Sequence, residues 1–206
     1  DYISRCNIDD LGITPPPAGL RIWIFNSMEV GSAVMLHHGA ILRSELAQSF
    51  LGKYSGILEF FLPDITIGTK VYSSYKEMYS ATCHELAHSS HFAKVGTDYW
   101  DKYIKYIVES YVLSGGELYG DGSSAGSGYC EVSEMWAYYI ESKLLKQRYG
   151  GAFPPIGTSW WFRGLEQDEI FSVFNEKVYS REALKNALLL KFPGNREMID
   201  QVFSRY

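Results

Sequence analysis

The sequence predicts an α+β fold in which a β-rich part comes first and a helical part follows. Short apolar runs rich in β-branched and aromatic residues lie within residues 1–72, whereas patterns with helical spacing dominate residues 73–206. A proline run at 15–17 ends an irregular lead-in before the first apolar run. Because strands come first and helices afterwards, the order is typical of an α+β chain with segregated halves.

The β-rich part contains four strand candidates and one helix candidate. Leu20-Arg21-Ile22-Trp23-Ile24-Phe25 alternates or runs apolar, as a strand does. The shorter strand candidates are residues 34–36, 56–61 and 65–67, and the short helix candidate is residues 44–50. We therefore expect the sheet of the fold to come from this part of the chain.

The helical part contains six helix candidates, of which the first has the clearest local signals. Ser74-Tyr75-Lys76-Glu77 has the pattern of a capping box, with Ser74 as the N-cap and Glu77 able to bond back to the Ser74 amide. No Gly or Pro follows until Gly96, so this helix is expected over Tyr75–Val95. The other helices are expected at residues 98–113, 129–149, 165–178, 181–191 and 196–206.

Length, composition and charge exclude several classes of protein. With 206 residues the chain can form one domain with a large core or two small lobes around a cleft. Apolar residues make up 46% and aromatic residues 16%, which excludes a disordered protein. The net charge of −5 comes without a Lys/Arg block, so no nucleic-acid partner is expected. No apolar run approaches the roughly 20 residues that a transmembrane helix needs.

The segment His84-Glu85-Leu86-Ala87-His88 is an HExxH pattern in the middle of the first long helix. Residues four apart lie on one helical face, about 6 Å apart along the axis, so two imidazoles can converge on one metal ion. Glu85 flanks the open coordination position, where it can take a proton from metal-bound water. The alternative is a chance pair of packed histidines with no metal.

A catalytic zinc needs three protein ligands and one open position. His91 lies about 10 Å along the axis from His84 on an unbroken helix, which is too far for one ion. It is therefore a group that supports the site or faces a substrate, or simply a packed polar residue. The other candidate is Glu134, on the expected helix 129–149. Ala137 on the same face is small enough to let that helix approach the histidine helix closely.

HExxH followed by Glu-x-x-Ala on a separate helix resembles the gluzincin metallopeptidases, whose third zinc ligand is that Glu. Together, residues 84–92 and 133–137 resemble secreted gluzincin-type metalloproteases of Bacteroidetes, and the resemblance covers about residues 74–141. It implies a zincin-like fold, with residues 1–206 as one catalytic domain and the zinc site between its two parts. His84, His88 and Glu134 would hold Zn²⁺, and Glu85 would activate the water.

The resemblance further implies a peptide or protein substrate and an extracytoplasmic location. No signal segment is visible, but the chain begins at Asp1 without Met, so this absence says nothing about location. The expected function is zinc-dependent peptide hydrolysis. The alternative is a non-catalytic binding or adhesion module on the same scaffold.

Two features depart from the family pattern. Many gluzincins carry an Asp four residues after the ligand Glu, where it bonds a zinc histidine, and this chain has Tyr138 there. Glu141, two turns after Glu134, is a distant substitute. The interval between the motifs is also longer than in thermolysin-like enzymes, which leaves Glu131 as an alternative third ligand. The oxyanion-stabilising residue is not assigned, and Tyr138 and Tyr139 are candidates.

The three cysteines, Cys6, Cys83 and Cys130, form no CxxC pair and cannot all pair with one another. We expect packed small residues around the site. A Cys83–Cys130 disulfide and an accessory thiolate ligand are the alternatives. The glycine-rich segment 115–128 is expected to be a flexible connection, or a mobile rim of the cleft.

Overall fold

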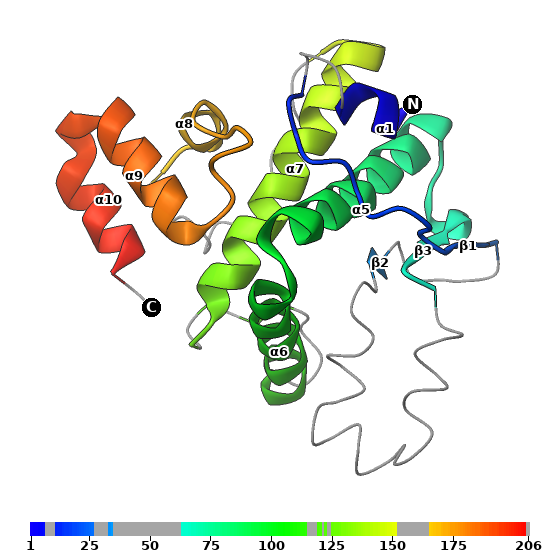
Figure 1. Ribbon diagram of the computed structural model, residues 1–206, viewed down its shortest axis with the longest axis horizontal. Coiled ribbons are helices and arrows are strands. Elements are labelled where there is room, and N and C mark those ends of the chain that lie inside the picture. Colours follow the sequence, from blue (N-terminus) through cyan, green and yellow to red (C-terminus); the bar gives the residue numbers. More distant parts are fainter. Residues whose placement is uncertain are drawn as a thin grey trace.

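The computed structural model describes residues 1–6, 11–26, 33–34, 63–114, 119–120, 122, 125–151 and 165–204. Within these ranges the protein is mainly helical, with a small sheet formed near the N-terminus (Figure 1). The strands precede the long helices, so the predicted α+β class is confirmed at this level. None of the helices in these ranges combines the length and the apolar character needed to cross a membrane.

Three long helices form the centre of the molecule. They are α5 (Tyr75–Val95), α6 (Thr97–Leu113) and α7 (Ser127–Tyr149). Helix α5 crosses α7 and packs along it, and α6 packs against both (Figure 1). Ala87 on α5 and Ala137 on α7 are fully buried, and small side chains at such positions allow close helix packing.

The ends of α5 follow from local chemistry. The Ser74 hydroxyl accepts from the Glu77 amide at 3.2 Å, as the capping pattern predicts. The Glu77 carboxylate accepts from the amide of Ser73 at 2.7 Å, one residue before the expected partner. This bond and the Ser73 hydroxyl lower the pKa of Glu77. The helix ends at Gly96, whose φ of 79° favours glycine.

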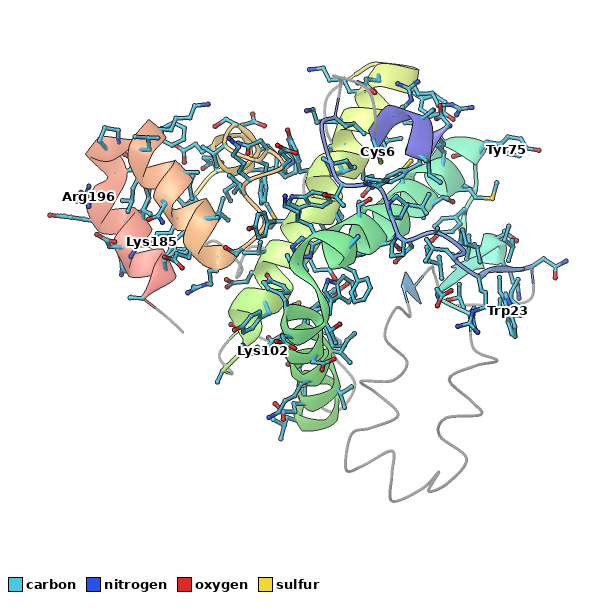
Figure 2. All side chains as sticks on the ribbon, in the orientation of Figure 1. Cys6, Trp23, Tyr75, Lys102, Lys185 and Arg196 are labelled. Carbon is cyan, nitrogen blue, oxygen red and sulfur yellow. The ribbon has the colours of Figure 1, made fainter. Side chains whose placement is uncertain are left out.

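The sheet has the order β1-β3-β2. Strands β1 (Ile22–Phe25) and β3 (Ile65–Gly68) are parallel, and β2 (Ala33–Val34) pairs antiparallel with β3. Helix α5 packs against β2 and β3, which places the sheet beside the histidine helix. On the outer strand, Trp23 lies at the edge of the molecule (Figure 2). The strand candidate 56–61 and the helix candidate 44–50 lie outside the described residues.

A C-terminal group of helices packs against α7, and its helix α9 makes this contact. It consists of α8 (Gln167–Phe171), α9 (Arg181–Lys191), the short 3₁₀ helix η3 (Pro193–Asn195) and α10 (Arg196–Phe203). The predicted helix at 165–178 is too long. Asn175 accepts from the Lys177 amide at 2.9 Å, and this turn diverts the chain away from a helical path.

The short helix α1 (Tyr2–Cys6) was not predicted. It is held by a tertiary contact, in which the Tyr2 hydroxyl lies 3.0 Å from the Ser90 hydroxyl on α5. All three cysteines are buried and free, so the disulfide alternative is wrong. Much of the glycine-rich segment 115–128 lies outside the described residues, and its expected mobility stays a prediction.

Candidate metal centre

Two helices bring three potential metal ligands together. His84 and His88 come from α5, and Glu134 comes from α7. The two Nε2 atoms lie 3.1 Å apart, and Glu134 Oε2 lies 3.4 Å from His84 Nε2 and 3.5 Å from His88 Nε2. Tetrahedral zinc with bonds of about 2.0–2.1 Å separates its ligand atoms by about 3.3 Å. The triangle therefore has the size that one such ion requires.

The electrostatics of these residues also favour a cation. Glu134 is 2% exposed, and its Oε2 accepts no hydrogen bond within the described part of the chain. Burial raises the pKa of this carboxyl, but the charges of His88 and His84 outweigh it and hold the pKa well below its usual range. Burial lowers the pKa of His84, but the nearby carboxylates of Glu134 and Glu141 raise it to about 10. The site thus holds a buried carboxylate that needs positive charge beside it.

Helix α7 runs antiparallel to α5 along this contact, so later residues of α7 meet earlier residues of α5. His88 faces Glu134, whereas His84, one turn earlier on α5, also reaches Glu141. His84 Nδ1 lies 3.0 Å from Glu141 Oε2, and the Ser80 hydroxyl donates to the same carboxylate. Donation from Nδ1 leaves the lone pair of Nε2 for a metal ion. Glu141 is therefore close enough to His84 to orient its ring.

Tyr138 and Tyr139 have different surroundings. The Tyr138 ring lies edge-on to the His84 ring at 4.6 Å, in the position where the family pattern expects Asp. The Tyr139 ring packs instead against Phe171 and Phe174 of the C-terminal group, with centroids 5.7 and 5.5 Å away. Of the two, only Tyr138 is therefore close to the candidate ligands.

Helix α6 contributes a contact that the sequence did not reveal. The Tyr103 hydroxyl donates to Glu134 Oε1 at 2.7 Å, which orients the carboxylate with Oε2 toward the histidines. The His88 ring packs against Trp100 and Tyr103, with centroids 6.0 and 6.2 Å away. No motif marks these aromatic residues, because their spacing on α6 is also that of an ordinary buried helix face.

Glu85 is buried beside the candidate ligands but does not belong to the ligand group. Its negative charge contributes to the raised pKa of His84. Burial is the main reason that the pKa values of Tyr119 and Tyr138 are raised, and the charges of Glu134 and Glu85 add to it. Both phenols therefore stay protonated at neutral pH, and both are close enough to Glu134 and Glu85 to be affected by their charges.

The two rival ligands lie elsewhere. Glu131 forms an ion pair with Arg181 at 3.2 Å and is not part of the ligand group. His91 is fully buried, and its Nε2–H donates to the carbonyl of Tyr179 at 2.8 Å. Burial lowers the pKa of His91 to about 3, so the ring is neutral. His91 is therefore buried and bonded to the backbone, as a packed polar residue is.

The cysteines do not extend the ligand group. Neither Cys83 nor Cys130 belongs to it within the described residues, and both side chains are buried. Burial raises the pKa of the Cys83 thiol to about 12, which disfavours the thiolate that a metal ligand requires. Cys83 and Cys130 are therefore packed small residues, as expected.

The exchange Glu141→Gln is expected to weaken zinc binding by about 10–100-fold, because a neutral amide holds the Nδ1–H of His84 less strongly. Competition with a chelating dye measures this affinity. Glu109→Gln is the matched control, since Glu109 is an exposed helix residue that pairs with Lys105 at 3.7 Å. Equal zinc affinity in Glu141→Gln and in the unaltered chain would show that Glu141 does not support the metal.

Comparisons with known proteins give no assignment: no family model, curated protein or solved structure matches this chain. The candidate centre therefore rests on the geometry and chemistry of its own residues. These are two imidazole nitrogens and one carboxylate oxygen at the separations of a single coordination sphere. A His₂Glu set of this kind can hold a metal ion and leave a further position open.

Proposed function

We propose that His84, His88 and Glu134 hold zinc and that the chain is a zinc-dependent peptide hydrolase. The observation that carries this proposal is the compact triangle formed by His84 Nε2, His88 Nε2 and Glu134 Oε2. Within the described residues, this Oε2 atom accepts no hydrogen bond. The HExxH segment also provides a carboxylate, Glu85, directly beside the first ligand. The resemblance of the two motifs to gluzincin metallopeptidases supports the same function and suggests an extracytoplasmic enzyme.

The choice of zinc follows from the donor set. Two imidazoles and one carboxylate form the ligand set of many catalytic zinc sites, whereas structural zinc sites use four protein ligands and often Cys. The candidate group contains three residues and no cysteine within the described ranges. This composition favours a metal with one position left for a reacting molecule.

A zinc ion held here would supply Lewis-acid activation of a water molecule and of a peptide carbonyl. Glu85 would be the general base that accepts a proton from the attacking water and returns it to the leaving amine. Glu141 keeps His84 in the tautomer that presents Nε2, and Tyr103 keeps Glu134 Oε2 directed at the same point. The protonated phenol of Tyr138, whose ring lies against that of His84, is a candidate donor to the oxygen that becomes negative.

A metal-binding module without turnover is the second candidate function. The burial of the centre favours it, since Glu85 is 7% exposed and both His88 and Glu134 are 2% exposed. A centre that excludes substrate would hold a metal only to stabilise the fold. Metal content alone does not separate this function from hydrolysis, so turnover must be measured as well.

The test combines metal analysis of protein purified without added metal with a broad peptide-library cleavage assay. A hydrolase is expected to carry one zinc per chain and to cleave peptides, with activity lost to a chelator and restored by zinc. Stoichiometric zinc without cleavage would support the metal-binding module. Protein that neither carries nor takes up zinc would overturn both candidate functions.

Zinc affinity is expected to increase with pH. In the metal-free protein the pKa of His84 is raised from 6.5 to about 10, so zinc must displace a proton at neutral pH. Displacement of one proton makes the apparent affinity rise by about tenfold per pH unit below that pKa. Isothermal titration between pH 6 and 8, in buffers of different ionisation enthalpy, measures both affinity and proton release. Affinity that stays constant over this range would contradict a protonated His84.

The proton on His84 also affects the stability of the metal-free protein, which should fall as the pH rises. A raised histidine pKa stabilises the folded state fully below the unfolded pKa of 6.5, and this contribution is lost as the pH rises toward about 10. The melting temperature of the metal-free protein should therefore fall over this range, while the increase caused by zinc grows. Thermal melts with and without zinc at each pH measure this divergence.

A further inference from the structure

The turn that leads into α9, residues 179–181, contacts the histidine helix α5. The buried Nε2–H of His91 donates to the carbonyl of Tyr179 at 2.8 Å. Lys94 adds a cation–π contact, with its Nζ 5.1 Å from the centre of the Tyr179 ring. His91 lies three residues after His88, one helical turn from a candidate ligand. The turn thus fixes α5 close to the metal centre.

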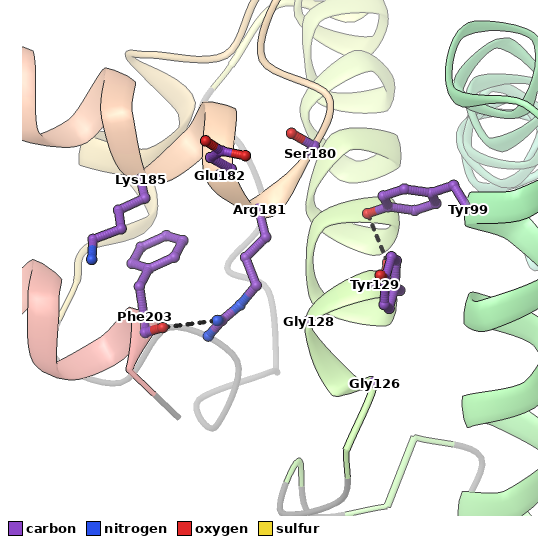
Figure 3. A pocket seen from close by; sticks show the side chains of 9 residues that line it. All are labelled: Tyr99, Gly126, Gly128, Tyr129, Ser180, Arg181, Glu182, Lys185 and Phe203. Carbon is purple, nitrogen blue, oxygen red and sulfur yellow. Dashed lines mark hydrogen bonds between the residues drawn. The ribbon is translucent and has the colours of Figure 1, made fainter. Parts of the chain in front are cut away.

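The same turn contacts α7, the helix that carries the third candidate ligand. Arg181 Nε donates to Glu131 Oε2 at 3.2 Å, and the Glu131 side chain is 3% exposed. Glu131 lies three residues before Glu134. The Arg181 stem lies directly on the first turn of α7, since a Cβ added at Gly128 would be 2.4 Å from Arg181 Cδ (Figure 3).

Arg181 is itself held by the end of α10. One terminal nitrogen donates to the carbonyl of Phe203 at 2.9 Å (Figure 3), and the other donates to the carbonyl of Val202 at 3.3 Å. The planar guanidinium thereby joins α10 to Glu131 in a fixed geometry that a flexible ammonium group does not reproduce. Three elements therefore meet at one side chain.

We propose that residues 179–181 form a clamp that sets the distance between the two ligand-bearing helices, with Arg181 as a positioning residue for the metal. This inference rests on the metal site proposed above. The clamp holds α5 through His91 and α7 through Glu131, each one turn from a candidate ligand. Metal ligands must be held within about 0.5 Å of their productive positions, so a small shift of α7 weakens coordination by Glu134.

Stability alone does not explain this ion pair. The Arg181 side chain is 18% exposed, but that of Glu131 is only 3% exposed. Taking the Glu131 carboxylate out of water is costly, and well-packed apolar residues in place of a buried ion pair often give equal or greater stability. A charged pair is better suited to fixing one relative position of packed elements, because its hydrogen bonds have a defined geometry. The clamp thereby fixes the relative position of packed helices beside a metal site whose ligands must be placed accurately.

The direct test compares Arg181→Met with Lys185→Met. Arg181→Met keeps an unbranched stem over Gly128 and removes the guanidinium. Lys185→Met removes a more exposed ion pair one turn later on α9, in which Lys185 Nζ lies 2.7 Å from Asp200 and joins α9 to α10. Arg181→Met is expected to weaken zinc binding by about tenfold or more, and Lys185→Met to leave it unchanged. Competition with a chelator measures both affinities on folded protein.

A spectroscopic readout separates positioning from general destabilisation. Cobalt bound in place of zinc reports its ligand geometry through its visible absorption, even at saturating metal. The cobalt spectrum of Arg181→Met should differ from that of the unaltered chain, whereas the spectrum of Lys185→Met should not. Arg181→Lys keeps a charge beside Glu131 and is expected to restore part of the affinity.

Gly128→Ala provides a second variant if Arg181→Met does not fold. The added methyl displaces the Arg181 stem without removing a polar group, and it too should weaken zinc binding and alter the cobalt spectrum. Unchanged affinity and spectra in the variants that fold would overturn the clamp and leave the proposed function intact. Failure of the unaltered chain to bind zinc would overturn the proposed function, and the clamp with it.

Discussion

The variant Glu85→Gln is expected to hydrolyse peptides about 10²–10⁴-fold more slowly than the unaltered chain and to bind zinc equally well. The exchange preserves the shape of the side chain but removes the base that takes the proton from water. Glu85 is not part of the group His84, His88 and Glu134, so metal affinity should not change. Slower hydrolysis with unchanged zinc affinity distinguishes a general base from a metal ligand.

Single-turnover peptide cleavage and a zinc competition titration measure the two effects. Glu77→Gln is the matched control. Glu77 lies in the first turn of the same helix, and its carboxylate accepts hydrogen bonds from the neighbouring Ser73 and Ser74. Full activity in Glu85→Gln would show that another group acts as the base. Reduced zinc affinity in this variant would indicate that Glu85 contacts the metal.

The variant Glu134→Ala is expected to lose more than about 100-fold in zinc affinity, because a direct ligand contributes more than the supporting residues whose loss costs 10–100-fold. Hydrolysis should be lost together with the metal. The metal-free variant should also be less stable than the unaltered chain, because the exchange leaves His84, His88 and the Tyr103 hydroxyl without their buried partner, so zinc affinity is compared on folded protein.

Glu131→Gln provides the comparison for this experiment. Both glutamates are buried on α7, one turn apart, but Glu131 pairs with Arg181. Glu131→Gln should still take up one zinc per chain, with the weaker affinity that a disturbed clamp implies. If Glu131→Gln loses the metal and Glu134→Ala retains it, the third ligand is Glu131 and the centre has been assigned to the wrong residue.

Local signals in the sequence predicted the best-defined helices. The predicted bounds of α5 and α9 agree with the structure because each helix begins at a serine cap, Ser74 or Ser180, whose hydroxyl accepts from an amide three residues later. Signals of this kind act within one turn and need no tertiary information. Helix α8 is shorter than predicted because it ends at Phe171, and the Asn175 turn then prevents a helical path up to residue 178.

The candidate site was predictable only in part. The HExxH spacing and the Glu-x-x-Ala pattern identified His84, His88 and Glu134, which do lie together. The contacts of Tyr103 with Glu134 and of Glu141 with His84 could not be predicted, because they depend on how α5, α6 and α7 cross.

The contact of Arg181 with Glu131 spans 50 residues and follows no local pattern. The same holds for the bond of His91 to the Tyr179 carbonyl, which spans 88 residues. Both depend on how the C-terminal group packs against the ligand helices, and helix periodicity carries no information about that packing.

A crystal structure of protein grown with zinc, with anomalous diffraction recorded on both sides of the zinc absorption edge, tests the central claim most directly. The expected result is one zinc about 2.0–2.2 Å from His84 Nε2, His88 Nε2 and Glu134 Oε2. Its fourth position should be open to solvent on the side of Glu85. A fourth protein ligand would contradict the hydrolytic function, and zinc bound elsewhere would contradict the site itself.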